Sequence, residues 1–141
     1  MREDTGDLWS YEAEYRVVTT NNVVTPNGLV MGAGVALQAK RRFPELPLKL
    51  AKAVSKFGNV PILCKQEGII TLPTKRHWRD PSDIDLIVQS VKALVVLVDD
   101  NKIASVVMTR PGCGNGWLTW KDVKPQIEGV LDDRFTVLGG E

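Results

Sequence analysis

The chain has 141 residues, of which 43% are hydrophobic and 25% charged, a length and composition typical of one globular domain built on a single core. Its 18 Lys and Arg nearly balance 17 Asp and Glu, which leaves a net charge of +1. The net charge is therefore too small for the protein as a whole to attract duplex DNA or an anionic membrane, and any site for a polyanion must be a local cluster of cations.

The sequence also argues against membrane spans and metal sites. No apolar stretch approaches the roughly 20 residues of a membrane span, and the N-terminal "MREDTGDLWS" lacks the apolar core of a signal peptide. Cys64, Cys113 and His77 are the only cysteines and histidine, too few for a disulfide framework or a zinc site. We expect residues 1–141 to form one cytoplasmic domain, a monomer without metal or cofactor.

Strand-like and helix-like segments alternate along the chain. In chain order they are a strand at 15–20, helices at 34–43 and 48–57, strands at 60–65 and 68–74, a helix over 84–98, a strand at 103–109, a helix after 119 and a strand at 134–138. Two of the strands are nearly continuous apolar runs, which suits strands covered on both faces. The order predicts an α/β fold with a mixed or parallel sheet between helices.

Two helices have starts that the sequence indicates. The long helix follows "DPSD", where we expect Asp80 to cap it and Pro81 to occupy its first position. In the last helix, Pro125 leaves the start open between Thr119 and Asp122.

Three loops that follow predicted strands are unusual, and ligands of α/β sheets bind at this edge. Loop 21–34 carries Gly28, Gly32 and Gly34 and leads into a helix, and loop 110–118 repeats the arrangement with alternating glycines. Such turns let the backbone approach a ligand and leave free N–H groups that favour phosphate. Together they predict a pocket for a diphosphate; the first loop in isolation is equally well explained as a flexible turn, and two unrelated tight turns are the alternative for the pair.

The third loop, "TKRHWRD" at residues 74–80, gathers cations, the histidine and a tryptophan. It is open to three interpretations: a solvated basic turn, a nucleic-acid contact or a wall of the active site. Because the loop directly follows a buried type of strand, Lys75 is the chemical group nearest the predicted pocket.

Four segments, "GDLW", "MGAGVALQAKRRFP", "LPTKRHWRD" and "GCGNGWLTWKDV", resemble in order and spacing a macro domain, the ADP-ribose-binding module. More narrowly they resemble the branch that contains DNA ADP-ribosyl glycohydrolase antitoxins and the terminal ADP-ribose protein glycohydrolase. The similarity runs from about Asp7 to Leu138. It implies a three-layer α/β/α macro domain with a mixed, largely parallel sheet and ADP-ribose lying across the strand ends.

The resemblance also implies a set of ligand-binding residues. The Asp7 carboxylate would accept a hydrogen bond from the adenine amino group. Either of two adjacent asparagines would contact the distal ribose, since extra residues around "VVTPNG" leave the register open. The residues expected to bind ADP-ribose are Asp7, Leu8, Asn21, Asn22, Met31, Gly32, Ala33, Gly34, Val35, Thr74, Pro111, Gly112, Cys113, Gly114, Asn115, Gly116 and Trp117.

By the same resemblance, Lys75 would act on the anomeric carbon of the distal ribose, with Asn22 and His77 as further catalytic residues. Two routes are open: Lys75 as general acid or electrostatic partner of the leaving group, or Lys75 as a nucleophile that forms an imine. The second route needs a neutral amine, which Arg76 and Arg79 would favour by like-charge repulsion.

At one position the sequence departs from the protein-directed enzyme in a way that bears on the substrate. The protein-directed enzyme carries an Asp where this chain has Gly116, whereas the DNA-directed branch shares "GCGNG", so we expect removal of ADP-ribose from thymine or guanine, in single-stranded DNA. Arg76, Trp78 and Arg79 would contact the nucleic acid, with Trp78 or Trp117 stacking on an unpaired base. Arg41 and Arg42 are further rim cations, or else a solvated helix end. The alternatives are a reader of ADP-ribose without catalysis, action on acidic protein side chains, and an ADP-ribose 1″-phosphate phosphatase.

Overall fold

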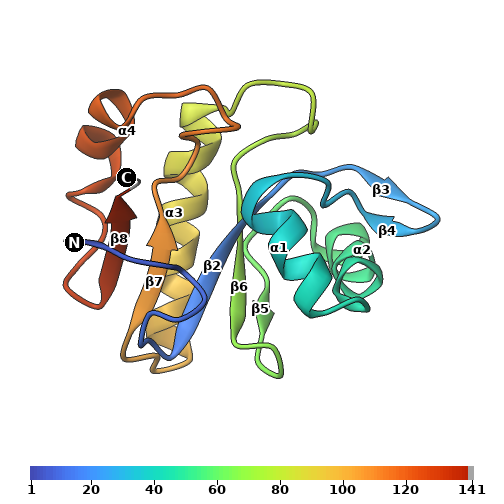
Figure 1. Ribbon diagram of the computed structural model, residues 1–141, viewed down its shortest axis with the longest axis horizontal. Coiled ribbons are helices and arrows are strands. Elements are labelled where there is room, and N and C mark those ends of the chain that lie inside the picture. The colour runs from blue at the N-terminus through green and yellow to red at the C-terminus, as the bar shows by residue number, and fades with distance from the viewer. Residues whose placement is uncertain (140–141) are drawn as a thin grey trace.

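The computed structural model describes residues 1–139, so the last two residues of the expected domain lie outside the described part. It has four helices and eight strands within that part (Figure 1). The strands are β1 (Arg2–Thr5), β2 (Tyr15–Thr20), β3 (Val24–Thr25), β4 (Gly28–Leu29), β5 (Leu63–Cys64), β6 (Ile69–Pro73), β7 (Val106–Thr109) and β8 (Phe135–Gly139). The helices are α1 (Gly34–Arg42), α2 (Leu46–Phe57), α3 (Ile84–Asp100) and α4 (Trp120–Ile127).

Six strands form the central sheet in the order β1-β8-β7-β2-β6-β5, and β3 pairs with β4 in a separate hairpin. All neighbours in the sheet are parallel except β5, which runs antiparallel to β6 at the edge. The carboxyl ends of β2, β6, β7 and β8 therefore meet at one edge, as the alternating sequence pattern predicts.

Helices cover both faces of this sheet, so the molecule has three layers (Figure 1). Side chains alternate along each strand: Val17 packs with α3 and α4, whereas its neighbour Val18 packs with α1 and α2. In β6, Ile70 and Ile69 divide in the same way. This burial on both faces explains the continuous apolar runs of the central strands. None of the helices in residues 1–139 has the length and apolarity to cross a bilayer.

The edges of the sheet differ from the prediction. β1 was not predicted, because "REDT" is polar and all four residues are exposed, and it is held by parallel pairing with β8. The expected strand at 60–65 shortens to β5, two residues long. The β3–β4 hairpin, which contains the extra "VVTPNG" residues, was also missed and packs against α2.

The structure changes the predicted start of α3 and fixes the start of α4, which the sequence left open. Asp80 does not cap α3: the N-cap is Asp83, whose side chain accepts hydrogen bonds from the backbone of Asp85 and Leu86. Pro81 accordingly lies before the helix and not in its first turn. Helix α4 begins at Trp120 with Thr119 as N-cap, and Pro125 is accommodated inside it.

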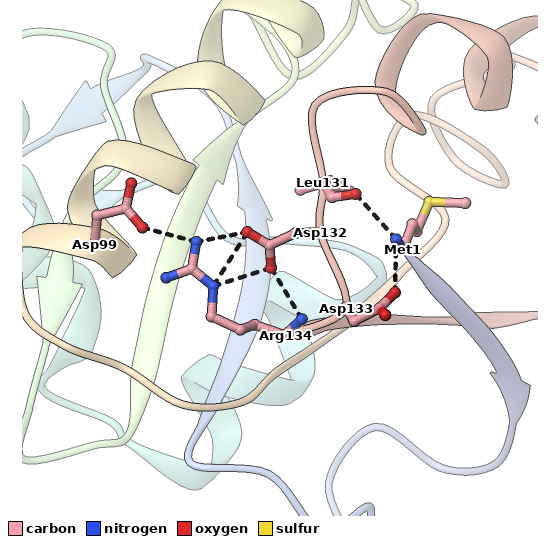
Figure 2. A network of polar contacts seen from close by, with 6 residues as sticks. All are labelled: Met1, Asp99, Leu131, Asp132, Asp133 and Arg134. Carbon is pink, nitrogen blue, oxygen red and sulfur yellow. Dashed lines mark hydrogen bonds and ion pairs between the residues drawn. The ribbon is translucent and has the colours of Figure 1, made fainter.

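A polar network ties β8 to α3 and to the N-terminus at the amino edge of the sheet (Figure 2). The Arg134 guanidinium donates to Asp132 at 2.6 Å and lies 2.7 Å from Asp99 at the end of α3. The Met1 ammonium donates to the Leu131 carbonyl at 2.9 Å. Because the network lies at the edge opposite the carboxyl ends of the strands, it serves the fold and leaves that other edge free for a site.

Candidate ligand-binding and catalytic site

A cavity of about 950 Å³ opens at the carboxyl ends of the parallel strands. Its floor includes Thr20 of β2, Thr109 of β7 and Gly139 of β8, together with Thr74 directly after β6. The volume lies at the upper end of the range for small-molecule pockets, which suits an elongated ligand.

One wall is the N-terminus of α1. Ala33 is its N-cap and offers no side-chain acceptor, so the first N–H groups of the helix have no side-chain cap. Gly34 has φ +56°, a conformation that favours glycine. Gly32, Ala33 and Gly34 all line the cavity. Uncapped N–H groups and the positive end of the helix dipole make this wall suited to an anion.

The opposite wall is the loop from Gly112 to Gly116. Gly112 has φ +78°, and its carbonyl accepts from the backbone N–H of Leu118 at 3.0 Å, which closes the loop. The backbone N–H groups of Asn115 and Gly116 make no hydrogen bond to any described residue. The wall therefore offers further donors to an anion.

Asn115 brings the two glycine loops and the lysine loop together. A Cβ atom on Gly34 would lie 2.9 Å from Asn115 Nδ2, so the two glycine loops touch at this point. The Asn115 carbonyl accepts a hydrogen bond from Lys75 Nζ at 3.0 Å. Three loops far apart in the sequence thus converge on one residue.

The start of the lysine loop is held by two backbone hydrogen bonds of Thr74. Thr74 N donates to Thr20 O at 3.1 Å, and Thr74 O accepts from Asp83 N at 2.9 Å. The position of Lys75 at the cavity follows from this double anchoring, since the chain leaves β6 directly beneath the pocket. Lys75 Nζ also donates to the Trp78 carbonyl at 3.4 Å.

Three charged side chains line the cavity within the described part of the chain: Asp7, Lys75 and Arg110. Two cations and one carboxylate suit a ligand that carries a diphosphate and a hydrogen-bond donor. Cys113 also lines the cavity, but burial raises the pKa of its thiol, so it stays protonated at neutral pH and is a poor nucleophile.

The two asparagines after β2 have different environments. Asn21 is buried and lines the cavity; its Nδ2 donates to Val30 O and its Oδ1 accepts from Val23 N, both at 2.9 Å. These bonds hold the base of the β3–β4 hairpin. Asn22 is exposed, does not line the cavity, and donates from its backbone to Arg76 O at 3.2 Å.

Three further residues of the lysine loop, Arg76, His77 and Arg79, do not line the cavity. Arg76 forms an ion pair with Asp83, so its charge is compensated instead of repelling the Lys75 ammonium. His77 accepts a hydrogen bond from the Arg79 backbone N–H through Nδ1 at 3.1 Å. Its ring stacks on Trp78 with 5.4 Å between centroids.

Comparison with known proteins identifies the family. A model of the macro domain family matches residues 25–127. The chain belongs to the macro domain family. Its sequence is 35% identical over 137 residues to a DNA ADP-ribosyl glycohydrolase of Thermus aquaticus, an alignment that covers 90% of this chain and 36% of that protein. The chain thus spans about a third of the length of that relative.

Solved structures agree with this assignment. The macrodomain of Mycobacterium tuberculosis DarG superposes with a TM-score of 0.83 at 33% identity, covering 99% of this chain and 97% of that one. Thermosipho africanus DarTG, solved in complex with ADP-ribose, superposes with a TM-score of 0.82 at 27% identity over 96% of this chain and 40% of that one. The three-layer α/β/α fold with a mixed, largely parallel sheet is therefore the macro domain fold.

The macro domain places most of the sequence-predicted residues around one cavity. Those that line it are Asp7, Leu8, Asn21, Met31, Gly32, Ala33, Gly34, Val35, Thr74, Lys75, Trp78, Gly112, Cys113, Gly114, Asn115 and Gly116. Those that are described but do not line it are Asn22, Arg76, His77, Arg79, Pro111 and Trp117. Arg41 and Arg42 lie in a neighbouring hollow with Asp7 and Trp9, at the other end of α1 from Gly34.

Sequence reasoning missed other lining residues: Gly6, Thr19, Thr20, Val30, Ala36, Gln38, Ser82, Thr109, Arg110, Leu138 and Gly139. Thr20, Thr109 and Gly139 are terminal residues of strands, so the rule that ligands bind at carboxyl ends could have found them. Gln38 follows Gly34 by four residues on the same helix face. Ser82 carried no sequence indication, because its position depends on where α3 meets the second glycine loop.

Proposed function

We propose that this macro domain binds ADP-ribose and removes it from single-stranded DNA, with Lys75 as the reacting group. The observation that carries the proposal is the placement of Lys75 Nζ, which lines the cavity and lies 3.0 Å from the Asn115 carbonyl where three loops meet. The relative of Thermus aquaticus carries the name DNA ADP-ribosyl glycohydrolase, and its similarity to this chain adds support.

The proposed ligand orientation follows the chemistry of the walls. The adenine amino group donates to the Asp7 carboxylate, and the diphosphate lies between the start of α1 and the loop around Gly114. The distal ribose then lies near Lys75. Of the two asparagines, Asn21 is the better candidate for contact with this ribose, because it lines the cavity and Asn22 does not.

The proposed chemistry is hydrolysis of the bond between C1″ of the distal ribose and the base nitrogen. Water adds to C1″, the glycosidic bond breaks with its electrons going to the base, and the base nitrogen takes up a proton. Lys75 serves as the donor or as the cation that stabilises the leaving base. We favour this route over imine formation because Arg76, one of the two arginines expected to favour a neutral amine by repulsion, is paired with Asp83.

Gly116 favours DNA over protein as the substrate. A Cβ atom at this position would lie 2.2 Å from the Gly112 carbonyl oxygen, so the loop has no room for the Asp that the protein-directed branch carries there. The second glycine loop therefore lacks that carboxylate, as it does in the DNA-directed branch that shares "GCGNG".

The test compares wild type with Lys75→Ala on matched ADP-ribosylated single-stranded DNA and ADP-ribosylated acidic protein. Wild type is expected to release ADP-ribose from the DNA, and Lys75→Ala is expected to lose at least about 100-fold in rate, the lower range for general acid–base catalysis, while it still binds ADP-ribose. Lys92→Ala, an exposed lysine on α3, is the matched control and should retain full activity.

Each other outcome assigns a different function. Binding of ADP-ribose without release from either substrate would indicate a reader. Release from protein alone would indicate the protein-directed activity, and turnover of ADP-ribose 1″-phosphate alone would indicate a phosphatase. An active Lys75→Ala variant would refute the assignment of Lys75.

A further inference from the structure

Two tryptophans stand exposed beside the Lys75 end of the cavity. Trp78 is 44% exposed and Trp117 is 73% exposed, unusual values for the largest apolar side chain. Lys75 Nζ donates to the carbonyl of Trp78 and to the carbonyl of Asn115, two residues before Trp117. Both tryptophans therefore lie at, or within two residues of, a backbone carbonyl that is hydrogen-bonded to the proposed reacting group.

Trp117 has a backbone conformation that bulky residues rarely adopt. Its φ is +64°, in the left-handed region, which costs about 1–2 kcal/mol for a residue with a side chain. The hydrogen bonds Trp117 N to Gly114 O, at 3.1 Å, and Leu118 N to Gly112 O, at 3.0 Å, hold it there. Since the side chain is mostly exposed, packing does not offset this cost. Such strain is characteristic of residues that act at a site.

A cation accompanies these aromatic rings. The Arg79 guanidinium lies 4.8 Å from the centroid of the Trp78 ring, and it forms no ion pair with any described residue. Its charge is thus available to a phosphate. Aromatic rings next to an unpaired cation are the combination with which proteins bind single-stranded nucleic acid, by stacking on bases and by pairing with the backbone.

From these contacts we infer that Trp117 and Trp78 stack on the unmodified bases that flank the ADP-ribosylated nucleotide, with Arg79 on a neighbouring phosphate. The inference rests on the proposed function: with ADP-ribose in the cavity and the scissile bond at Lys75, the modified base lies at the mouth and its neighbours meet the two rings. Trp117 is accordingly a contact for the DNA strand and not for ADP-ribose, which agrees with its absence from the cavity lining.

The experiment measures kcat/KM on two substrates, an ADP-ribosylated mononucleotide and an ADP-ribosylated single-stranded oligonucleotide. Wild type is expected to prefer the oligonucleotide. Trp117→Ala should reduce this preference about 5- to 150-fold, the equivalent of roughly 1–3 kcal/mol per stacked base, and Trp117→Phe should restore part of it. Phe57→Ala, which truncates a 60% exposed aromatic side chain on α2, is the matched control and should keep the preference.

A calorimetric titration with free ADP-ribose separates stacking from a structural role. If Trp117→Ala weakens ADP-ribose binding and lowers activity equally on both substrates, the ring supports the loop and the inference is wrong. If wild type cleaves both substrates equally well, the inference fails while the proposed function stands. If wild type releases nothing from either substrate, the proposed function fails and the inference falls with it.

Discussion

Replacement of Gly116 by alanine tests the geometry of the second glycine loop. The added Cβ would lie 2.2 Å from Gly112 O, 2.3 Å from Ser82 Oγ and 2.6 Å from Gly112 C. Non-bonded carbon and oxygen atoms need more than about 3 Å, so the loop has to move by roughly 1 Å. Two of the three neighbours are backbone atoms, which cannot move aside by a change of rotamer.

The expected cost follows from this overlap. Overpacking of a well-packed site costs about 1–3 kcal/mol, and the shift also strains the hydrogen bond from Ser82 N to Gly116 O at 2.9 Å. We expect Gly116→Ala to lower the free energy of unfolding by this amount. Because Asn115 moves with the loop, its contact with Lys75 Nζ weakens, and we expect affinity for ADP-ribose to fall by about tenfold, or 1.4 kcal/mol.

Denaturant unfolding gives the stability, and isothermal titration calorimetry gives the affinity. Gly129→Ala is the matched control, because a Cβ there meets nothing within 4 Å and the residue lies outside the cavity. It should leave affinity unchanged and stability equal or higher by less than about 1 kcal/mol. Wild-type stability and affinity in Gly116→Ala would refute the described loop conformation, and with it the reason for a missing carboxylate at this position.

Two further predictions concern the segment that precedes α3. Ser82 Oγ is buried and has no hydrogen-bond partner among the described residues, so Ser82→Ala should raise the free energy of unfolding by about 1 kcal/mol; a clear loss in denaturant unfolding would contradict this. The Arg76 guanidinium lowers the pKa of Asp83, which also caps α3, so Asp83→Ala should cost about 1 kcal/mol near neutral pH. A carboxyl group with a lowered pKa in the folded state stabilises the fold at pH values above its unfolded pKa of about 4, and this stabilisation is lost as the pH falls through the folded pKa. The difference in unfolding free energy between wild type and Asp83→Ala should therefore shrink in acid. A difference that stays constant down to about pH 2 would exclude the Asp83 charge as its source.

The local pattern of apolar residues was sufficient to predict the central strands and the longest helix. β2, β6, β7 and α3 were predicted because their apolar residues follow one periodicity and are buried accordingly. The sequence did not predict β1, since four exposed polar residues have no strand pattern and pair only because β8 offers a free edge. The cap of α3 was misplaced for a related reason: Asp80 and Asp83 are both acceptable N-cap residues, and the backbone contact between Asp83 and Thr74 selects the second.

For the site, the sequence by itself determined the chemical groups: glycines after two strands, a lysine after a third, and the motifs that resemble a macro domain. Loops of this kind take their conformation from contacts with distant residues, so their mutual arrangement could not be read from local pattern. The tertiary structure decided that Asn21 lines the cavity while Asn22, His77 and Trp117 do not, and that Arg110 and Ser82 do. It also decided that Asn115 joins Gly34 to Lys75, because only the folded sheet brings the ends of β2, β6 and β7 to one edge.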